Sequence, residues 1–175
     1  MEIPKRNDPS DFECEPFEDY FARFPQELNH IPEDVVKNWM WYHNEQVVEF
    51  SQLYDFTKWK FSLEDFDNDK IMEIQHFEYD LKLLDGKGQE FLKGCLNEHD
   101  TAKFMFENGT SPCPMIVTKD AGNHIHHQRE EGNLMLEPYH LIEGNRRLAY
   151  LRAMIGKPFP RLKESHKVWV VEIEE

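Results

Sequence analysis

The sequence predicts a mixed α/β fold in which a small mixed β-sheet carries helices and follows an acidic, mainly helical N-terminal region. Apolar residues at helical spacing dominate the first 103 residues. Short apolar runs bounded by turns, and one strand–glycine–helix unit, dominate the remainder. We therefore expect a helical region over residues 1–103 that packs on a sheet-containing core over residues 104–175.

The first fifty residues contain one clear helix start. Residues 1–20 are acidic and proline-containing, which predicts an extended arm that lies on the domain or is partly disordered. Pro32 followed by Glu33 and Asp34 is typical of a first helical turn, and predicts a helix over 32–42. Its apolar side consists of Val35, Val36, Trp39, Met40 and His43. A second apolar set follows and either continues this helix or forms a separate turn: Val47, Val48, Phe50, Leu53 and Tyr54.

Alternation over 57–63 predicts a strand with Trp59, Phe61 and Leu63 on one face. Apolar residues at helical spacing follow over 71–84 and predict a helix. The Asp-Gly-Lys-Gly run at 85–88 is expected to interrupt it. A further helix is expected over 90–99, whereas 101–106 is ambiguous. We assign the aromatic residues at periodic apolar positions to the core rather than to base stacking: Trp39, Trp41, Trp59, Phe61 and Trp169.

The last seventy residues read as strands and turns. A turn cluster over 108–114 precedes a buried strand at Met115–Val117. A polar loop or loose hairpin over 119–133 is followed by a strand over 139–142. A helix then begins after Gly144 with Leu148, Leu151 and Ile155 at helical spacing, and Gly156 ends it. The run over 168–173 is apolar on both faces and predicts an internal strand.

Charge and cysteine content limit the classes of function. The chain has a net charge of −14, and residues 1–103 hold 11 basic against 24 acidic side chains. Such a surface repels a nucleic-acid backbone, so nucleic-acid binding over most of the surface is disfavoured. The three cysteines are widely spaced, which fits a reducing cytoplasm. No apolar run reaches the length of a signal core or a membrane helix, so no membrane contact is expected.

The turn after the strand at 139–142 carries the strongest functional signal. Arg146 and Arg147 fall in the first turn of a helix, where the helix dipole is already positive. Backbone N–H groups, two guanidinium groups and a glycine that permits close approach together favour a bound anion. The sequence therefore predicts a phosphate site at Gly144–Arg147. The alternative is a tight turn whose two arginines pair with acids.

Three segments together resemble the ParB/sulfiredoxin-like superfamily. Cys113-Pro114-Met115-Ile116-Val117 resembles its opening strand. Tyr139-His140-Leu141-Ile142-Glu143-Gly144-Asn145-Arg146-Arg147-Leu148-Ala149 resembles its strand and arginine-rich helix start, and 168–173 resembles its closing strand. In this superfamily a Gly-x-x-Arg turn binds nucleotide phosphates. The resemblance thus implies that Gly144 allows close approach and that Arg147 binds phosphate.

The chain departs from the superfamily pattern at two positions. Asn145 stands where sulfiredoxin has its cysteine, so sulfiredoxin chemistry is not expected. Ala149 replaces the last arginine of the ParB motif, and no helix-turn-helix pattern or basic tail follows the core. We therefore expect similarity to stand-alone ParB-like proteins of bacteria and phages rather than to chromosome-partition proteins. Relatives include nucleases, ATPases and a kinase for free serine, so fold does not settle function.

The predicted ligand is a nucleotide, ATP or CTP, held with Mg²⁺. The expected activity, if there is one, is that of a phosphotransferase, NTPase or nuclease. Glu143 is either a magnesium ligand or general base, or an ion-pair partner that orients Arg147. Catalysis is assigned to Glu143 and Arg147. Cofactor binding is assigned to a wider set: Gly144, Asn145, Arg146, Arg147 and His140.

Histidines and cysteines give a weaker signal. His124, His126 and His127 are either metal ligands, with Glu130 and Glu131 the nearest acids, or solvated loop side chains. The sequence leaves the metal unidentified. Cys95 and Cys113 are expected to be small buried groups rather than nucleophiles, because neither has an obvious electropositive helix start nearby.

A second class of function is compatible with the same sequence. The acidic first part of the chain would contact a basic protein partner, as an inhibitor or regulator in a phage–host context. The arginine turn would then be a vestigial site without catalysis.

Overall fold

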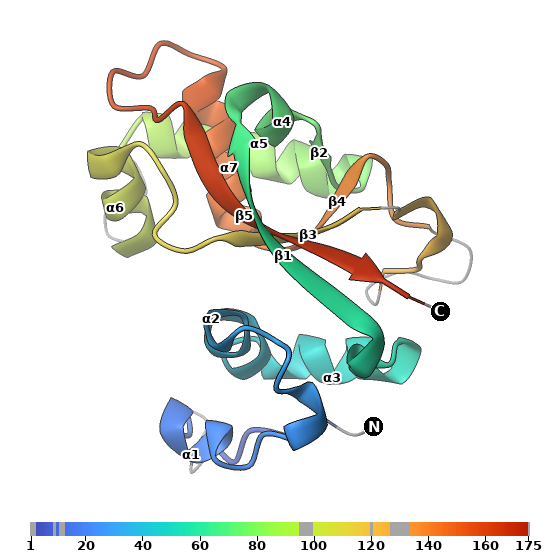
Figure 1. Ribbon diagram of the computed structural model, residues 1–175. Helices are drawn as coiled ribbons and strands as arrows, with labels where there is room; N and C mark the ends of the chain where they lie inside the picture. The colour runs from blue at the N-terminus through green and yellow to red at the C-terminus, as the bar shows by residue number, and fades with distance from the viewer. Residues whose placement is uncertain are drawn as a thin grey trace. The chain divides into compact units, whose positions relative to one another are not determined.

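The computed structural model describes residues 3–8, 10, 13–94, 100–119, 121–126 and 134–174 (Figure 1). These residues form two compact units. The first contains the described residues up to Phe61 together with 125–126 and 173–174, and the second contains 62–124 and 134–172. The predicted boundary between residues 103 and 104 lies inside the second unit. In the described part of the chain, no helix is long and apolar enough to cross a membrane.

Short helices build the first unit. Helix α1 is Phe17–Phe21, α2 is Glu33–Val35 and continues as a π-helical segment over Val36–Trp41, and α3 is Asn44–Leu53. The helix predicted to begin at Pro32 is confirmed, with Pro32 as its N-cap. The second apolar set forms a separate helix, α3.

Aromatic side chains fill the core of the first unit. Trp39 and Trp59 are fully buried and stack with ring centroids 5.9 Å apart. Phe50 and Phe56 contact both indoles, mostly edge to face. The sequence assignment of Trp39 and Trp59 to the core is therefore confirmed.

The N-terminal segment lies on α3. This agrees with the expectation that residues 1–20 form an extended arm lying on the domain. The Asn44 side chain accepts a hydrogen bond from the Arg6 N–H at 2.9 Å and donates to the Pro4 carbonyl at 3.0 Å. Ile3 is buried. Because one amide satisfies both a backbone donor and a backbone acceptor, it fixes the segment without regular structure of its own.

The described strands form one mixed sheet in the order β1-β5-β3-β4-β2. Their bounds are Trp59–Asp67 for β1, Ile74–Gln75 for β2, Met115–Lys119 for β3, Tyr139–Glu143 for β4 and Ser165–Ile173 for β5. Strand β3 pairs parallel with β5 and antiparallel with β4, and β2 pairs parallel with β4. The predicted fold class and the internal position of β5 are confirmed.

The second unit contains four α-helices among its described residues. Their bounds are Asn68–Met72 for α4, Glu78–Leu92 for α5, Asp100–Asn108 for α6 and Asn145–Ile155 for α7. Helices α5 and α7 cross on the same side of the sheet (Figure 1). Alternate residues of the inner strands, including Val117, Leu141 and Val170, join both helices in one apolar cluster. This cluster fixes the place where β4 passes into α7.

Three sequence assignments in residues 57–99 are wrong. The Asp-Gly-Lys-Gly run does not end a helix, because α5 continues through it. The stretch over 71–84 is divided among α4, β2 and α5 rather than forming one helix. Strand β1 begins two residues later and ends four residues later than predicted, and Leu63 is 45% exposed instead of facing the core with Trp59.

Candidate functional site

The turn between β4 and α7 depends on a glycine. Gly144 has φ 117°, a conformation that side-chain-bearing residues rarely adopt, and it is the N-cap of α7. A Cβ atom there would lie 2.7 Å from Cγ of Met115 in β3. Strand, turn and helix therefore meet closely only because residue 144 lacks a side chain.

Arg147 points into this meeting place. The residue is 7% exposed, and one guanidinium nitrogen donates to the carbonyls of Pro114 at 2.6 Å and Cys113 at 3.1 Å. The other terminal nitrogen forms an ion pair with Glu143. Burial alone would lower the pKa of Arg147, but the carboxylate of Glu143 and the thiol of Cys113 raise it above its usual value. Arg147 thus joins the loop before β3, the end of β4 and the first turn of α7.

These contacts change the role expected for the pair Glu143 and Arg147. The structure brings them together as the ion-pair interpretation of Glu143 requires. The guanidinium of Arg147 serves internal acceptors and is not presented to solvent, so its direct binding of phosphate is not supported by this geometry. The superfamily resemblance implied the opposite orientation.

Asn145 and Arg146 occupy the exposed side of the same turn. Because the N-cap is a glycine, it supplies no side chain to accept from the first N–H groups of α7. Within the described residues, the Arg146 guanidinium has neither an ion pair nor a hydrogen bond. A positive side chain and the positive helix end therefore face the same solvent region.

Tyr150 was not identified from the sequence. It lies one turn after Arg146, its side chain is fully buried, and its hydroxyl has no hydrogen-bond partner in the described part of the chain. Burial raises the pKa of the Tyr150 hydroxyl, the Arg146 charge lowers it and Glu90 raises it. Only the i, i+4 spacing from Arg146 could have indicated this position, and that spacing is equally typical of a core residue.

His140 does not join the turn. Side chains alternate along β4, so His140 faces the side of the sheet opposite to Leu141 and Glu143. It is fully buried, between the rings of His76 and Phe77, with centroids 5.2 and 4.8 Å away. The structure therefore separates His140 from the other predicted cofactor-binding residues.

The loop histidines are not solvated where they are described. His124 is 7% exposed and His126 is 3% exposed, and His126 packs edge to face on Phe50 at 5.2 Å. His127, like Glu130 and Glu131, lies outside the described residues. Among the described side chains no group of three or more metal-ligating residues is assembled.

Cys113 has the electropositive neighbour that the sequence analysis did not expect. Its sulfur lies 2.9 Å from a guanidinium nitrogen of Arg147 in the first turn of α7, so the expectation that no electropositive helix start lies nearby is wrong. The neighbour comes from α7, thirty-four residues away, which a local sequence pattern does not reveal. Cys113 is half-buried, Cys14 is exposed, and Cys95 lies outside the described residues.

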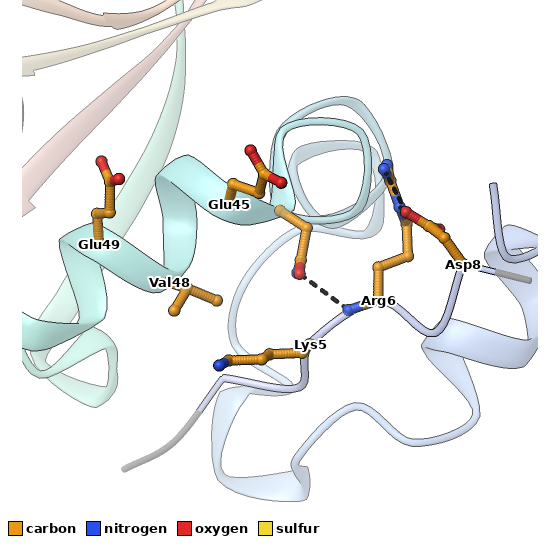
Figure 2. A pocket seen from close by; sticks show the side chains of 7 residues that line it. Lys5, Arg6, Asp8, Glu45, Val48 and Glu49 are labelled. Atoms are coloured by element: carbon orange, nitrogen blue, oxygen red, sulfur yellow. Dashed lines mark hydrogen bonds and ion pairs between the residues drawn. The ribbon is translucent and has the colours of Figure 1, made fainter. Parts of the chain in front are cut away.

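A separate pocket of about 420 Å³ lies in the first unit, between the N-terminal segment and α3 (Figure 2). Figure 2 shows Lys5 and Arg6 on the segment, with Glu45, Val48 and Glu49 on the helix. Arg6 is held by Asp8 at 2.7 Å and by the carbonyl of Trp41. The mixed charges of this pocket give it less preference for an anion than the α7 turn has.

Comparison with known proteins adds no assignment, because no protein family, curated protein or solved structure matches this chain.

Proposed function

We propose that this protein binds a phosphate-bearing ligand, such as a nucleotide, at the first turn of α7. The observation that carries the proposal is the exposed Arg146 guanidinium, which has no partner among the described residues and stands beside a helix end that its N-cap does not cap. Backbone N–H groups at a helix start and a guanidinium fork are two common phosphate ligands. The buried Tyr150 hydroxyl one turn away is a further polar group without a partner in the described residues.

Arg147 has a positioning role in this proposal. Its bonds to the Cys113 and Pro114 carbonyls and to Glu143 hold the turn in place, so that Arg146 faces outward. Glu143 is occupied by this ion pair. The proposal is therefore one of binding, and transfer or cleavage of the phosphoryl group would require Glu143 to leave Arg147 and reach Mg²⁺ or water.

A melting experiment tests the binding. Inorganic phosphate, ATP and CTP are each added with and without Mg²⁺ in a thermal-shift titration. A ligand at ten times its Kd stabilises the folded state by about 1.4 kcal/mol, a rise in Tm of roughly 3–5 °C for a chain of this size. Arg146→Ala should abolish the rise.

Arg161→Ala is the matched control, because Arg161 is also an exposed arginine of the second unit but lies outside α7. It should keep the full ligand-induced rise. If the unmodified protein shows no rise with any of the three ligands up to millimolar concentration, the proposed function is refuted.

A basic protein partner is the second candidate. Two observations favour it. Residues 1–103 hold 24 acidic but only 11 basic side chains, and Glu45 and Glu49 on α3 are exposed. Association with a lysine-rich model peptide should weaken with salt and be reduced by Glu45→Gln with Glu49→Gln. Arg146→Ala should leave it unchanged.

A further inference from the structure

The Tyr150 hydroxyl is a buried polar group that the fold itself does not use. It is fully buried, yet it has no hydrogen-bond partner in the described part of the chain. Leaving a buried hydroxyl unpaired is costly, so native proteins normally satisfy such groups with protein, water or a ligand. The Tyr150 hydroxyl is therefore available to a partner that binds.

Two indole N–H groups in the first unit also lack a hydrogen-bond partner among the described residues, but they have a local explanation. Trp39 and Trp59 sit in a cluster where Phe50 meets both rings edge to face, at 76° and 82°. An N–H group among such rings can point at an aromatic face. The Tyr150 hydroxyl does not point at the face of Phe91 in this way. The two rings stack flat, with ring planes 19° apart and centroids 4.4 Å apart.

The stacking also limits the direction of the hydroxyl. In a flat stack the phenol oxygen lies in the ring plane and points past the neighbouring ring. Side chains in a helix lean toward its N-terminus, over the residue four positions earlier. For Tyr150 that residue is Arg146, and the charges of Arg146 and of Glu90 in α5 both act on the Tyr150 hydroxyl. The lean of the side chain thus places the hydroxyl on the Arg146 side of α7, with Glu90 of α5 also near it.

We propose that the Tyr150 hydroxyl is the inner contact of the anion site, donating a hydrogen bond to an oxygen of a phosphate group held by Arg146. This inference rests on the proposed function and adds a ligand-contacting residue to it. A phosphate oxygen is an acceptor and matches a group whose donor is unused. Because the hydroxyl is fully buried, this contact requires the exposed Arg146 side chain to shift as the anion enters.

Tyr150→Phe tests this role with two opposite effects. The substitution removes the oxygen and keeps the ring stacked on Phe91. The unliganded variant should melt at the same temperature as the unmodified protein or higher, because an unpaired buried hydroxyl is lost. Its affinity for inorganic phosphate or for the best nucleotide of the panel should fall roughly tenfold, the loss expected for one hydrogen bond to a charged group.

Each result separates the two proposals. If Tyr150→Phe binds as tightly as the unmodified protein while Arg146→Ala does not bind, the Tyr150 role is wrong and the proposed function stands. If the unliganded Tyr150→Phe protein melts at a lower temperature, the hydroxyl has a structural partner and the inference is overturned. If the unmodified protein binds no anion, both proposals fail. Phe91→Leu, which alters the stack but keeps the hydroxyl, should retain more affinity than Tyr150→Phe.

Discussion

Arg146 and Arg147 are adjacent in the sequence but have different surroundings, because successive helical residues point about 100° apart. Arg147 reaches the carbonyls of Cys113 and Pro114, whereas Arg146 is exposed. The sequence identified the pair as important, but it could not say which arginine faces the protein. That choice depends on β3, whose entry loop supplies the acceptors.

Replacement of the two arginines should separate these roles. Arg147→Ala removes the ion pair from the largely covered carboxylate of Glu143 and is expected to lower the free energy of unfolding by about 3 kcal/mol. Arg147→Lys should be intermediate, since an ammonium cannot reproduce the guanidinium fork. Arg146→Ala should change stability by less than about 0.5 kcal/mol. Urea unfolding measures all three, and equal losses for both alanine variants would contradict the inward role of Arg147.

His166 should make stability depend on pH. Its Nδ1 accepts from the Thr110 hydroxyl at 2.9 Å and its Nε2 donates to Oδ1 of Asn68 at 3.1 Å, so the neutral ring is satisfied. Burial lowers the pKa of His166 below its usual value of 6.5. The unfolded chain therefore takes up a proton at higher pH than the folded one, and stability falls as the pH drops below about 6.5.

His166→Gln isolates this effect from that of the other histidines. The variant should lose some stability at pH 8, because the substitution alters the hydrogen bonds to Thr110 and Asn68. Between pH 7 and pH 5 its free energy of unfolding should fall less than that of the unmodified protein. Urea unfolding at each pH measures the two slopes. Parallel slopes would show that His166 does not titrate between the two states.

At the scale of elements, local signals were sufficient where they agreed with long-range packing. Pro32 correctly marked a helix start, and the apolar run at Met115 correctly marked β3. The run containing Gly86 and Gly88 was misleading, because glycine normally disfavours a helix interior. Contact between α5 and α7 overrides that preference, and the sequence alone does not reveal which helix lies opposite. The turn at Gly144 was predictable, whereas the contribution of Tyr150 required the structure.

The two glycines of α5 should respond to alanine in opposite directions. A Cβ on Gly88 would lie 2.4 Å from the Ala149 carbonyl oxygen and 2.8 Å from Cβ of Ala153, while one on Gly86 meets nothing within 4 Å. Gly88→Ala is expected to cost about 1–3 kcal/mol by forcing α5 away from α7. Gly86→Ala should stabilise by roughly 0.5–1 kcal/mol through helix propensity. Thermal melts of the two variants measure the difference, and a shift of the same sign in both would contradict the close packing at Gly88.

At the scale of the whole molecule, each unit is assembled from distant parts of the chain. Within the first unit the Tyr54 hydroxyl donates to the Ile125 carbonyl at 2.7 Å and accepts from the Ile125 N–H at 2.6 Å. Lys60 forms an ion pair with Glu174 in the same unit. The boundary predicted between residues 103 and 104 assumed that each unit is continuous in sequence, which the pattern of apolar residues could not test.

A chain cut after Phe61 should therefore fail to form the aromatic core of the first unit. The fragment lacks Ile125, which bonds the Tyr54 hydroxyl, and His126, whose ring packs on Phe50. Near-ultraviolet circular dichroism should show no signal from the stacked Trp39 and Trp59. The full-length Tyr54→Phe variant is the control and should keep the signal, with a stability loss of about 1–2 kcal/mol. A fragment with the full aromatic signal would contradict the dependence on Ile125.

The Tyr54–Ile125 contact also sets the order of events while the protein is being synthesised. The ribosome must add seventy-one residues after Tyr54 before Ile125 exists. During that interval the aromatic residues of the first unit are expected to lack this long-range contact. We therefore expect this chain to depend on chaperones more during translation than after it.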